Sequence, residues 1–563
     1  MAQKGIGAIR DYFRQIEAEG QDHIYEAKLL IVGEAGAGKT SLAKKIEKPD
    51  YQLNPDEGST QGIDITQWEF PMEDGTPFRV NVWDFGGQEI YHATHQFFLT
   101  RRSLYALVAD SRKEDTDFYY WLNAVDLLSD GSPMLIVKNE KQGRQCQLDE
   151  GQLRGQFANL KETLATNLRT NDGLDAVVQN IKHHVQQLPH IGDRLPKTWV
   201  RVRQALEQDT CDWIKLDEYI EICQENGFKE RSDMLQLSDY LHDLGICLHF
   251  QADPLLKNIL ILNPEWGTDA VYRVLDNRRV IDNQGQFTRA DLDQIWDEPE
   301  YVDMRDELLR LMVNFKLCYE VSGATGTYIA PQLLSFNQPE YEWDRSDNLI
   351  LCYSYNDFMP KGIVARLIVA MHREIADQRL VWRNGAVLEH EKTRAEVVAN
   401  RGRREIKIHV KGQDKKAFLA IVTRELDKIH RSFNRLNWDK LVPCNCQECK
   451  DSGEPYFHEL KILKKFIEDR QRSIQCQQSY ERVDLRGLID DVIDPKLSDP
   501  CQVGQINCRG NISVPGDNNR ISYNNCVFNE MRQASQPAKT IAWSNRLKNL
   551  IGFLKWLWAL IPN

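Results

Sequence analysis

The feature that most constrains the fold of this chain is a glycine-rich segment between a predicted strand and a predicted helix. It follows the apolar run Lys28–Val32, precedes a helix-compatible stretch from Ser41 to Glu47, and reads Gly33-Glu34-Ala35-Gly36-Ala37-Gly38-Lys39-Thr40. This is the pattern G-x-x-x-x-G-K-[ST] in the strand–turn–helix context that it requires. Its glycines let backbone N–H groups turn toward a phosphate at the positive end of a helix. The segment predicts a nucleotide-binding P-loop at residues 33–41, and the alternative is a glycine-rich turn with a chance lysine.

Two side chains of this segment have defined roles in P-loops. Lys39 reaches the β- and γ-phosphates, and the Thr40 hydroxyl ligates Mg²⁺. Thr60 lies further along the chain, in Gly58-Ser59-Thr60-Gln61-Gly62, where a switch threonine would close on the same ion. The alternative for Thr60 is an ordinary loop residue.

A second predicted strand, Val80–Asp84, is followed by Phe85-Gly86-Gly87-Gln88-Glu89. In P-loop enzymes a carboxylate at the end of a strand beside the loop is the usual Mg²⁺ partner through water, and Asp84 fits that place. The glycines allow the Gly87 N–H to approach a γ-phosphate, and Gln88 is the candidate catalytic residue that orients the attacking water. A plain tight turn would also use two glycines, but the P-loop upstream favours the catalytic interpretation.

The run from Val82 to His92 resembles the Roc domain, which is the Ras-like GTPase of Roco proteins. Later segments resemble the COR region that accompanies Roc, in the same order as in that family: Leu195–Val202, Leu241–Gly245, Asn263–Trp266 and Phe358–Gly362. The resemblance implies a Mg²⁺-dependent GTPase that binds GTP and GDP and is coupled to homodimerisation through COR. It also implies that the dimer partner helps to complete the catalytic site.

The predicted fold class is α/β, with a Ras-like P-loop GTPase domain followed by a mixed α+β COR region. Amphipathic stretches separate apolar runs that suit a mostly parallel, doubly wound sheet: Leu29–Val32, Val80–Trp83, Leu104–Ala109 and Met134–Val137. A Pro/Gly-rich boundary follows at 189–196. For COR, the resemblance implies a winged-helix-like first half and an α+β second half that supplies the dimer surface.

These observations divide the chain into five predicted regions. They are an N-terminal helical linker (1–27), Roc (28–190), the first half of COR (191–340), the second half of COR (341–495) and a low-order tail (496–563). The leucine-rich repeats that many Roco proteins carry before Roc have no matching period here. The chain is therefore interpreted as a short member of the family or a fragment that begins at the repeat–Roc junction.

Ras-like GTPases usually read guanine with an N-K-x-D motif, whose aspartate accepts two hydrogen bonds from the base. Here Asn139 matches, but Glu140 stands in place of the lysine and Gln142 in place of the aspartate. A neutral amide offers one acceptor and one donor, so it cannot repeat this double acceptance. Asn167 begins an equally imperfect match to the second base-binding loop. We still expect GTP, with Asn139, Gln142 and Asn167 near the base, because the other Roc motifs are present.

Composition restricts the class of partner. The 563 residues are 42% hydrophobic and 27% charged, as in ordinary soluble globular proteins. The net charge of −12 argues against nucleic-acid binding, which needs a basic surface. The start of the chain has no apolar signal-peptide core, and most of the 13 cysteines are expected to be reduced thiols. The expected localisation is cytoplasmic.

The tail ends in a Trp- and Leu-rich stretch at residues 544–561 that also carries basic side chains. It is too short and too interrupted for a membrane span. An amphipathic helix here would dock onto the protein or a partner, which is the favoured interpretation, or lie in a membrane interface. Peripheral membrane contact therefore stays open.

A cysteine cluster forms a further candidate site. Cys444, Cys446 and Cys449 are followed by His458 nine residues later. Three thiolates and one imidazole can bind Zn²⁺. The spacing C-x-C-x₂-C is not a common zinc-ribbon pattern, so structural thiols in a tight loop are favoured and zinc is the alternative.

Three functions remain open from the sequence. The favoured one is a GTPase switch, and the second is a scaffold that binds GTP with negligible turnover and signals to unknown protein effectors. The third is a kinase-associated family member, because some Roco proteins carry a kinase after COR. The chain itself has no H-R-D-x-x-x-x-N motif, and its Asp84-Phe85-Gly86 belongs to the predicted switch.

Overall fold

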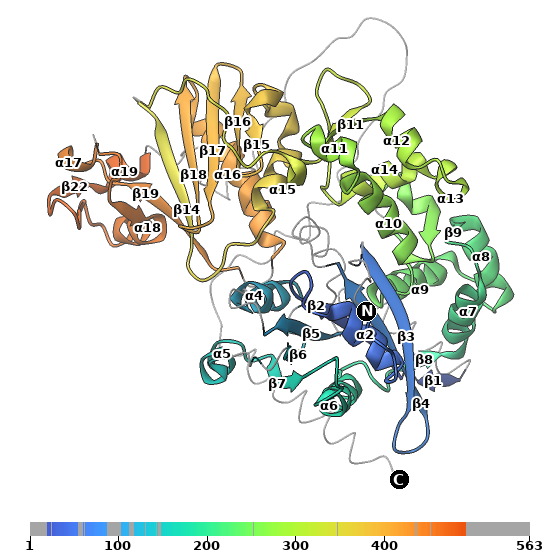
Figure 1. The fold of residues 1–563 in the computed structure, drawn as a ribbon. Coiled ribbons are helices and arrows are strands. Elements are labelled where there is room, and N and C mark those ends of the chain that lie inside the picture. Colours follow the sequence, from blue (N-terminus) through green and yellow to red (C-terminus); the bar gives the residue numbers. More distant parts are fainter. Residues whose placement is uncertain are drawn as a thin grey trace, which may run out of the picture. The chain divides into compact units, whose positions relative to one another are not determined.

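The computed structural model describes residues 20–490, apart from 24, 55–59, 61, 87–102, 112–117, 130, 142–143, 145–147, 252, 346, 434–435 and 451. We refer to three consecutive parts as the first region (26–186), the second region (194–333) and the third region (349–490) (Figure 1). Within the described part of the chain, no helix combines the length and the apolar character needed to cross a membrane.

The first region is a six-stranded sheet with the strand order β3-β4-β2-β5-β6-β7. Neighbouring strands are parallel, except that the edge strand β3 runs antiparallel to β4. The strands are β2 (Glu26–Val32), β3 (Ile63–Pro71), β4 (Pro77–Phe85), β5 (Ser103–Asp110), β6 (Met134–Asn139) and β7 (Leu160–Thr166). The helices are α2 (Lys39–Glu47), α4 (Phe118–Ser129), α5 (Glu150–Gln156) and α6 (Leu174–Gln186).

Helices cover both faces of this sheet because its central strands are apolar on both sides. Every residue of β5 is buried, which is the pattern of a strand in the middle of a parallel sheet. Side chains of α2 and α6 share one core with one face of β2, and those of α4 and α5 share another core with the opposite face. The four predicted strands are confirmed as parts of β2, β4, β5 and β6. Because these four strands are parallel, their carboxyl ends lie at the same end of the sheet, which brings the P-loop, Asp84 and Asn139 together.

The second region is mostly helical and carries small antiparallel sheets, β9–β10 and β11–β13–β12. Its helices are α7 (Lys197–Gln208), α8 (Leu216–Glu225), α9 (Arg231–Asp243), η3 (Leu256–Asn258), α10 (Pro264–Leu275), α11 (Arg278–Asp282), α12 (Arg289–Ile295), α13 (Pro299–Val302), α14 (Arg305–Asn314) and η4 (Pro331–Leu333). Its strands are β9 (Trp213–Lys215), β10 (Ile259–Ile261), β11 (Gln286–Thr288), β12 (Tyr319–Glu320) and β13 (Thr327–Ile329). At its start, β8 (Arg194–Pro196) pairs with β1 (Gln21–His23).

The third region is built on an antiparallel seven-stranded sheet with the order β15-β16-β17-β18-β14-β19-β20. Its strands are β14 (Leu349–Tyr355), β15 (Val381–Trp382), β16 (Gly385–His390), β17 (Thr393–Asn400), β18 (Glu405–Gly412), β19 (Trp438–Pro443) and β20 (Phe457–Glu459). Its helices α15 (Ile363–Ala370) and α16 (Lys415–Arg431) pack against each other and the sheet, and η5 (His372–Glu374) and η6 (Gln378–Leu380) precede β15.

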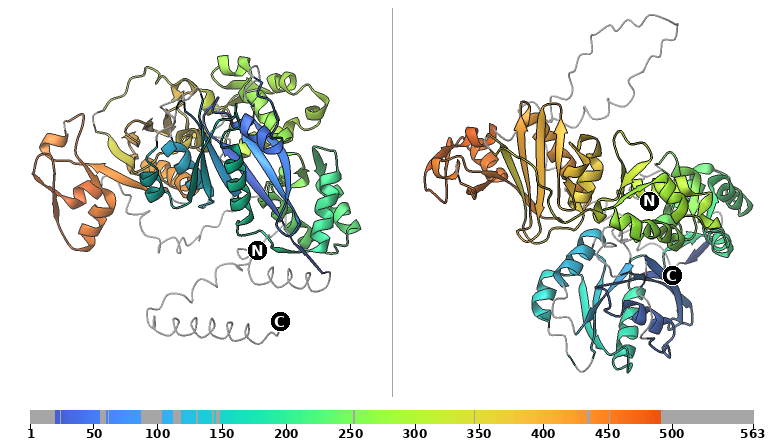
Figure 2. Two further views of the ribbon diagram at one scale, coloured as in Figure 1. Left: turned by 60° about the horizontal axis from the view of Figure 1, so that its bottom comes forward. Right: turned by 45° about the horizontal axis from the view of Figure 1, so that its top comes forward.

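A small group of elements lies at the β19–β20 edge of that sheet (Figure 2). It consists of α17 (Gln447–Lys450), α18 (Leu460–Glu468), the hairpin β21 (Ser473–Gln475) and β22 (Arg482–Asp484), and α19 (Leu485–Asp490). Its buried residues belong to the same core as the large sheet.

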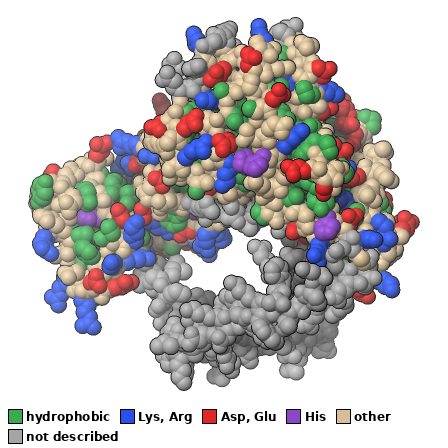
Figure 3. Space-filling view, turned by 90° about the horizontal axis from the view of Figure 1, so that it is seen from below, with side chains coloured by type: hydrophobic (Ala, Val, Ile, Leu, Met, Phe, Trp, Pro, Cys, Tyr) green, Lys and Arg blue, Asp and Glu red, His purple; other side chains and the backbone are tan. Residues whose placement is uncertain are grey.

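The predicted fold class is confirmed: a parallel-sheet α/β region is followed by mixed α and β structure. Positive and negative side chains are interspersed over the described part of one face (Figure 3). The predicted tail 496–563 with its Trp-rich stretch lies outside the described residues, as does most of the predicted linker 1–27. The described end of that linker, Gln21–His23, is strand β1 and not helix.

Candidate functional site

The P-loop connects the end of β2 to the start of α2, as predicted. Its backbone needs glycine at two positions, because φ is 139° at Gly33 and 104° at Gly38. A Cβ atom at Gly33 would lie 2.3 Å from the Val108 carbonyl oxygen, and one at Gly38 would lie 2.5 Å from Nδ2 of Asn139. Gly38 is the N-cap of α2 and has no side chain with which to cap this end of the helix. The loop is therefore closely fitted to its neighbours, and its helix end suits an anion.

Lys39 opens α2 and is almost fully buried, with 6% of its surface exposed. Its Nζ atom donates a hydrogen bond of 2.9 Å to the Glu34 carbonyl oxygen at the start of the loop. The Glu34 side chain accepts a hydrogen bond of 3.1 Å from Nε1 of Trp121 on α4. The lysine charge is thus held against the backbone of the loop, and Ser41 follows in the first turn of α2.

The three residues predicted to hold Mg²⁺ lie together beside the P-loop. Thr40 Oγ1 is 2.7 Å from Thr60 Oγ1 and donates a hydrogen bond of 2.6 Å to Asp84 Oδ2. Thr60 Oγ1 donates a second hydrogen bond, of 2.9 Å, to the same carboxylate oxygen. Thr40 comes from α2, Asp84 from the end of β4, and Thr60 from the segment before β3. Three distant segments therefore place hydroxyl and carboxylate oxygens at one point.

The carboxylate of Asp84 fits a cation at this point. It is buried, and among the described residues no group donates a hydrogen bond to its Oδ1 atom. Burial raises its pKa to about 6, although hydrogen bonds from Thr40 and Thr60 and the charge of Lys39 act in the opposite direction. Oxygen ligands of this kind suit hard divalent ions such as Mg²⁺. These residues are consistent with the predicted metal site.

Asn139, at the end of β6, holds the P-loop from the side. Its Nδ2 donates a hydrogen bond of 2.9 Å to the Ala37 carbonyl oxygen, and its Oδ1 accepts one of 3.5 Å from the backbone N–H of Leu168. The side chain of Asn167 is used inside its own loop, where Oδ1 accepts from the N–H groups of Arg169 at 3.0 Å and Thr170 at 3.3 Å. Asn139 therefore links the P-loop to the loop that contains Asn167 and Leu168.

Lys141 has a role that the match to the N-K-x-D motif did not predict. That match places Glu140 at the lysine position of the motif. In the structure, Lys141 Nζ donates hydrogen bonds of 3.1 Å to the Gly36 carbonyl oxygen and to Asp110 Oδ2. The carboxylate of Asp110, at the end of β5, is buried. A lysine one position beyond the expected one thus reaches the P-loop. Gly87, Gln88 and Gln142, which were also predicted, lie outside the described residues.

The segment after Thr60 contacts the second region, which the sequence did not indicate. A Cβ atom at Gly62 would lie 2.6 Å from the ring of Tyr272 on α10. Asp64 on β3 is close enough to Glu265 and Asp269 of α10 to disfavour their ionisation. Burial first, and then this repulsion, raise the pKa of Glu265 to about 7. Burial and the charge of Asp64 raise that of Asp269 to about 6, against the opposing charge of Arg273.

Ion pairs also join the first region to α7. Arg203 of α7 pairs with Glu26 of β2 and bonds through Nε at 3.0 Å with Glu207. Glu207 in turn lies 3.1 Å from Nη1 of Arg79 on β4. The side chains of Arg203 and Glu26 are each 12% exposed, so this pair is largely shielded from water, whereas Arg79 and Glu207 are 32% and 28% exposed. These ion pairs connect β2 and β4 to α7, the helix that follows β8.

The predicted cysteine site is corrected by the structure. Cys444, Cys446 and Cys449 lie together, but their fourth neighbour is Cys476 and not His458. His458 sits on β20 opposite Val442 of β19, where its ring packs against Tyr456. Cys476 follows β21, and its distance along the chain kept the local spacing from revealing it.

Three family models match the chain in order. "Ras of Complex, Roc, domain of DAPkinase" matches residues 28–142, "C-terminal of Roc, COR-A domain" matches 196–334, and "C-terminal of Roc, COR-B domain" matches 346–491. The chain is 26% identical over 420 residues to a Roc-COR-CHAT protease of Runella zeae, and 24% identical over 452 residues to the probable serine/threonine-protein kinase pats1 of Dictyostelium discoideum.

These alignments cover most of this chain but less of the relatives. They include 70% and 72% of the chain, against 45% of the Runella protein and 14% of pats1. Among solved structures, Methanosarcina barkeri Roco2 RocCORdC bound to GDP is 33% identical with a TM-score of 0.50, covering 56% of this chain and 98% of that one. Because Roc, COR-A and COR-B follow one another along the sequence and this solved Roco structure resembles it, the chain belongs to the Roco family of Roc–COR proteins.

Proposed function

We propose that this protein binds GTP and GDP together with Mg²⁺ and hydrolyses GTP. The observation that carries the proposal is the meeting of Thr40, Thr60 and Asp84 oxygens next to the P-loop lysine. Such a cluster is the arrangement that a Mg²⁺–triphosphate needs at a P-loop. The likeness to a Roco structure bound to GDP supports the same nucleotide class.

Each residue has a stated part in this proposal. Lys39 and the backbone amides of residues 34–41 hold the phosphates, and the glycines at 33, 36 and 38 let the loop close around them. Thr40 and Thr60 would hold Mg²⁺ directly and Asp84 would hold it through water, and the bound ion would supply positive charge to the phosphates. From the sequence motif, Gln88 would orient the attacking water and the Gly87 N–H would bind the γ-phosphate. Asn139 and Lys141 brace the P-loop from the side on which the base would lie, and the motif assigns Gln142 and Asn167 to the base.

We further propose that the nucleotide state reaches COR through β3 and α10. Thr60 would move with the γ-phosphate, and Gly62 lies only two residues further on, against Tyr272. The backbone of Ile65 on β3 partly offsets the rise in the pKa of the Glu265 carboxylate, and β3 and α10 are in contact. A change at Thr60 would therefore alter the packing of β3 on COR-A. Homodimerisation through COR-B, as the family resemblance implies, would carry the signal between chains.

The proposal is tested by equilibrium binding of GTP, GDP and ATP to the purified chain in the presence of Mg²⁺. We expect GTP and GDP to bind more tightly than ATP. Lys39→Ala should weaken GTP binding by about 100-fold, the effect of losing about 3 kcal/mol from charged hydrogen bonds. Lys48→Ala is the matched control, because Lys48 is exposed at the opposite end of α2. Parental affinity in Lys39→Ala would refute the phosphate site, and a preference for ATP would refute the guanine assignment.

A further inference from the structure

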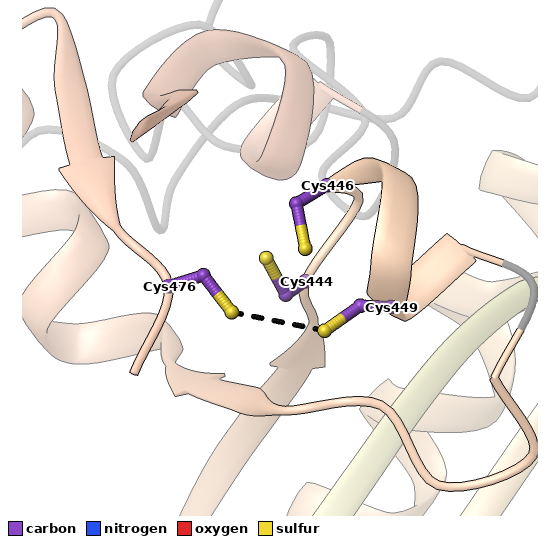
Figure 4. A group of neighbouring side chains, drawn as sticks. All are labelled: Cys444, Cys446, Cys449 and Cys476. Atoms are coloured by element: carbon purple, nitrogen blue, oxygen red, sulfur yellow. Dashed lines mark hydrogen bonds between the residues drawn. The ribbon is translucent and has the colours of Figure 1, made fainter. Parts of the chain in front are cut away.

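Four buried cysteines meet at one point in COR-B (Figure 4). Cys444 follows β19, Cys446 precedes α17, Cys449 lies within α17, and Cys476 follows β21. Their exposed fractions are between 0% and 3%. All four are free thiols, and their sulfur atoms point toward a common centre. Two segments that are separate in the sequence thus supply ligand-type atoms to one place.

The spacing of these sulfur atoms matches a metal site better than a disulfide. All four Sγ atoms lie within 4.8 Å of one another, and those of Cys449 and Cys476 are 3.7 Å apart. Zn–S bonds of about 2.3 Å in a tetrahedron place neighbouring sulfurs about 3.8 Å apart. A disulfide would require about 2.0 Å. The cluster therefore already has the size of a four-thiolate zinc site.

Polar hydrogens around the cluster point at its sulfur atoms. The N–H of Tyr456 donates to Cys449 Sγ at 3.4 Å, and the N–H of Ser479 donates to Cys476 Sγ at 3.5 Å. The Ser479 hydroxyl donates to Cys446 Sγ at 3.2 Å. Sulfur is a weak acceptor as a thiol and a much better one as a thiolate, and metal ligands usually receive such hydrogen bonds from the surrounding shell. Cysteines that only fill an apolar core have no need of these donors.

We propose that Cys444, Cys446, Cys449 and Cys476 bind one Zn²⁺ ion in a closed, structural site. With four protein ligands, no position remains for water or substrate, so the site is not catalytic. Binding releases the thiol protons and links the segment after β19 to the β21–β22 hairpin. This inference is independent of the proposed GTPase function, because it uses no residue of the nucleotide site.

The ion would fix the end of COR-B to its main sheet. Cys449 and Cys476 are 27 residues apart in the sequence, and the chain between them forms β20, α18 and β21. Helix α19 directly follows the hairpin and buries Leu485 and Leu488 in the core of COR-B. Zinc holds the hairpin in the position from which α19 can pack. Loss of the metal would therefore loosen the last elements of COR-B before the rest of the sheet.

The first test is metal content of the full chain, purified with a thiol reductant and without added chelator. We expect one zinc ion per chain by elemental mass spectrometry. Replacement by Co²⁺ should give the intense visible bands of tetrahedral cobalt and a strong thiolate-to-cobalt band in the near ultraviolet. Failure of the reduced parent chain to bind stoichiometric Zn²⁺ would overturn the proposal, as would a weak octahedral cobalt spectrum.

Variants identify the ligands. Cys476→Ser should lose the zinc ion, whereas His458→Gln and Cys352→Ser should keep it. Cys352 is a buried cysteine of the β14 strand outside the cluster, so it controls for thiol loss in the same region. Loss of zinc in His458→Gln with retention in Cys476→Ser would replace the four-cysteine assignment by a Cys₃His site. If Cys476→Ser does not fold, metal content and the cobalt spectrum of the parent and of His458→Gln still decide the matter.

Discussion

Asn139 shows how one side chain can hold two loops of a nucleotide site. It donates to the Ala37 carbonyl oxygen of the P-loop and accepts from the N–H of Leu168. The Asn139 side chain packs closely against the P-loop, because a Cβ atom on Gly38 would lie 2.5 Å from the Asn139 Nδ2 atom. Removing this amide leaves a buried carbonyl oxygen and a buried N–H without their partner.

Asn139→Ala should therefore weaken GTP and GDP binding to a similar degree. We expect about a tenfold loss, since a hydrogen-bonding amide contributes about 1–2 kcal/mol. Glu140→Ala, at the next position, is the control and should bind like the parent. Isothermal titration with each nucleotide measures the effect. Unchanged affinity in Asn139→Ala would show that the P-loop keeps its shape without this brace.

Gln88, the predicted catalytic residue, lies outside the described residues. Gln88→Leu should slow GTP hydrolysis by about 100-fold with little change in affinity, because a group that orients water acts only during reaction. Gln67→Leu changes an exposed glutamine of β3 and should hydrolyse GTP at the parental rate. A Gln88→Leu enzyme as fast as the parent would assign the water-orienting role to another group.

Single residues differ in how well the sequence predicted them. Lys39, Thr40 and Asp84 follow from motifs whose spacing fixes their positions next to a strand or helix end. Lys141 was missed because the lysine position was taken from a strict register, while the side chain is long enough to reach Gly36 from one residue further on. Cys476 was missed because only the β21–β22 hairpin brings it to the other cysteines.

At the scale of elements, the contact between β3 and α10 places three carboxylates close together. Glu265 and Asp269 of α10 face Asp64 of β3, with Arg273 and Glu300 nearby. Burial and this repulsion raise the pKa values of Glu265 and Asp269 to about 7 and about 6. At a pH between the ordinary carboxyl pKa and these raised values, Glu265 and Asp269 are therefore more often protonated in the folded state than in the unfolded state. The repulsion is relieved at low pH and is fully present above about pH 7.

Glu265→Gln should raise the melting temperature at about pH 8 and have much less effect at about pH 5, because the parent is already protonated there. The amide has nearly the shape of the carboxylate, so the substitution changes mainly its charge. Glu221→Gln, on the exposed side of α8, should show no such pH dependence. Differential scanning calorimetry across this pH range makes the measurement. An equal shift at both pH values would mean that the carboxylates do not repel one another in the folded protein.

Elements were predictable where burial leaves a continuous apolar run. The runs in β2, β4, β5 and β6 are of this kind, and each was found within its strand. The strands β3 and β7 were not predicted, because each lies at an edge of the sheet and mixes buried with exposed side chains. Their places depend on pairing with β4 and β6, which local sequence does not encode.

At the scale of the whole molecule, contacts between Roc and COR-A were the least predictable part. The order of the regions follows from collinear motifs, but the pairs Arg203–Glu26 and Arg79–Glu207 join residues that are far apart in the sequence. Charged residues at these positions are equally compatible with a solvent-exposed surface. Only the position of α7, within ion-pair distance of β2 and β4, gives them a common role.

The proposed function of COR makes a prediction about the assembly. Multi-angle light scattering of the purified chain should give twice the 65.3 kDa mass of one chain. The measurement is made with GDP and with a non-hydrolysable GTP analogue, and the dimer fraction should differ between the two states if nucleotide and dimerisation are coupled. A monomer in both states at micromolar concentration would contradict homodimerisation, and an identical dimer fraction would contradict the coupling.

Single-turnover phosphate release shows most directly whether Thr40, Thr60 and Asp84 form the Mg²⁺ site of a working GTPase. The purified chain, preloaded with GTP, should release phosphate in Mg²⁺ and stop when the ion is chelated. Asp84→Asn should slow release at least about tenfold, as expected for losing one charged metal contact. Asp175→Asn, at the start of α6, should react like the parent. Equal release without Mg²⁺ or in Asp84→Asn, or bound GTP that is never cleaved, would contradict the account.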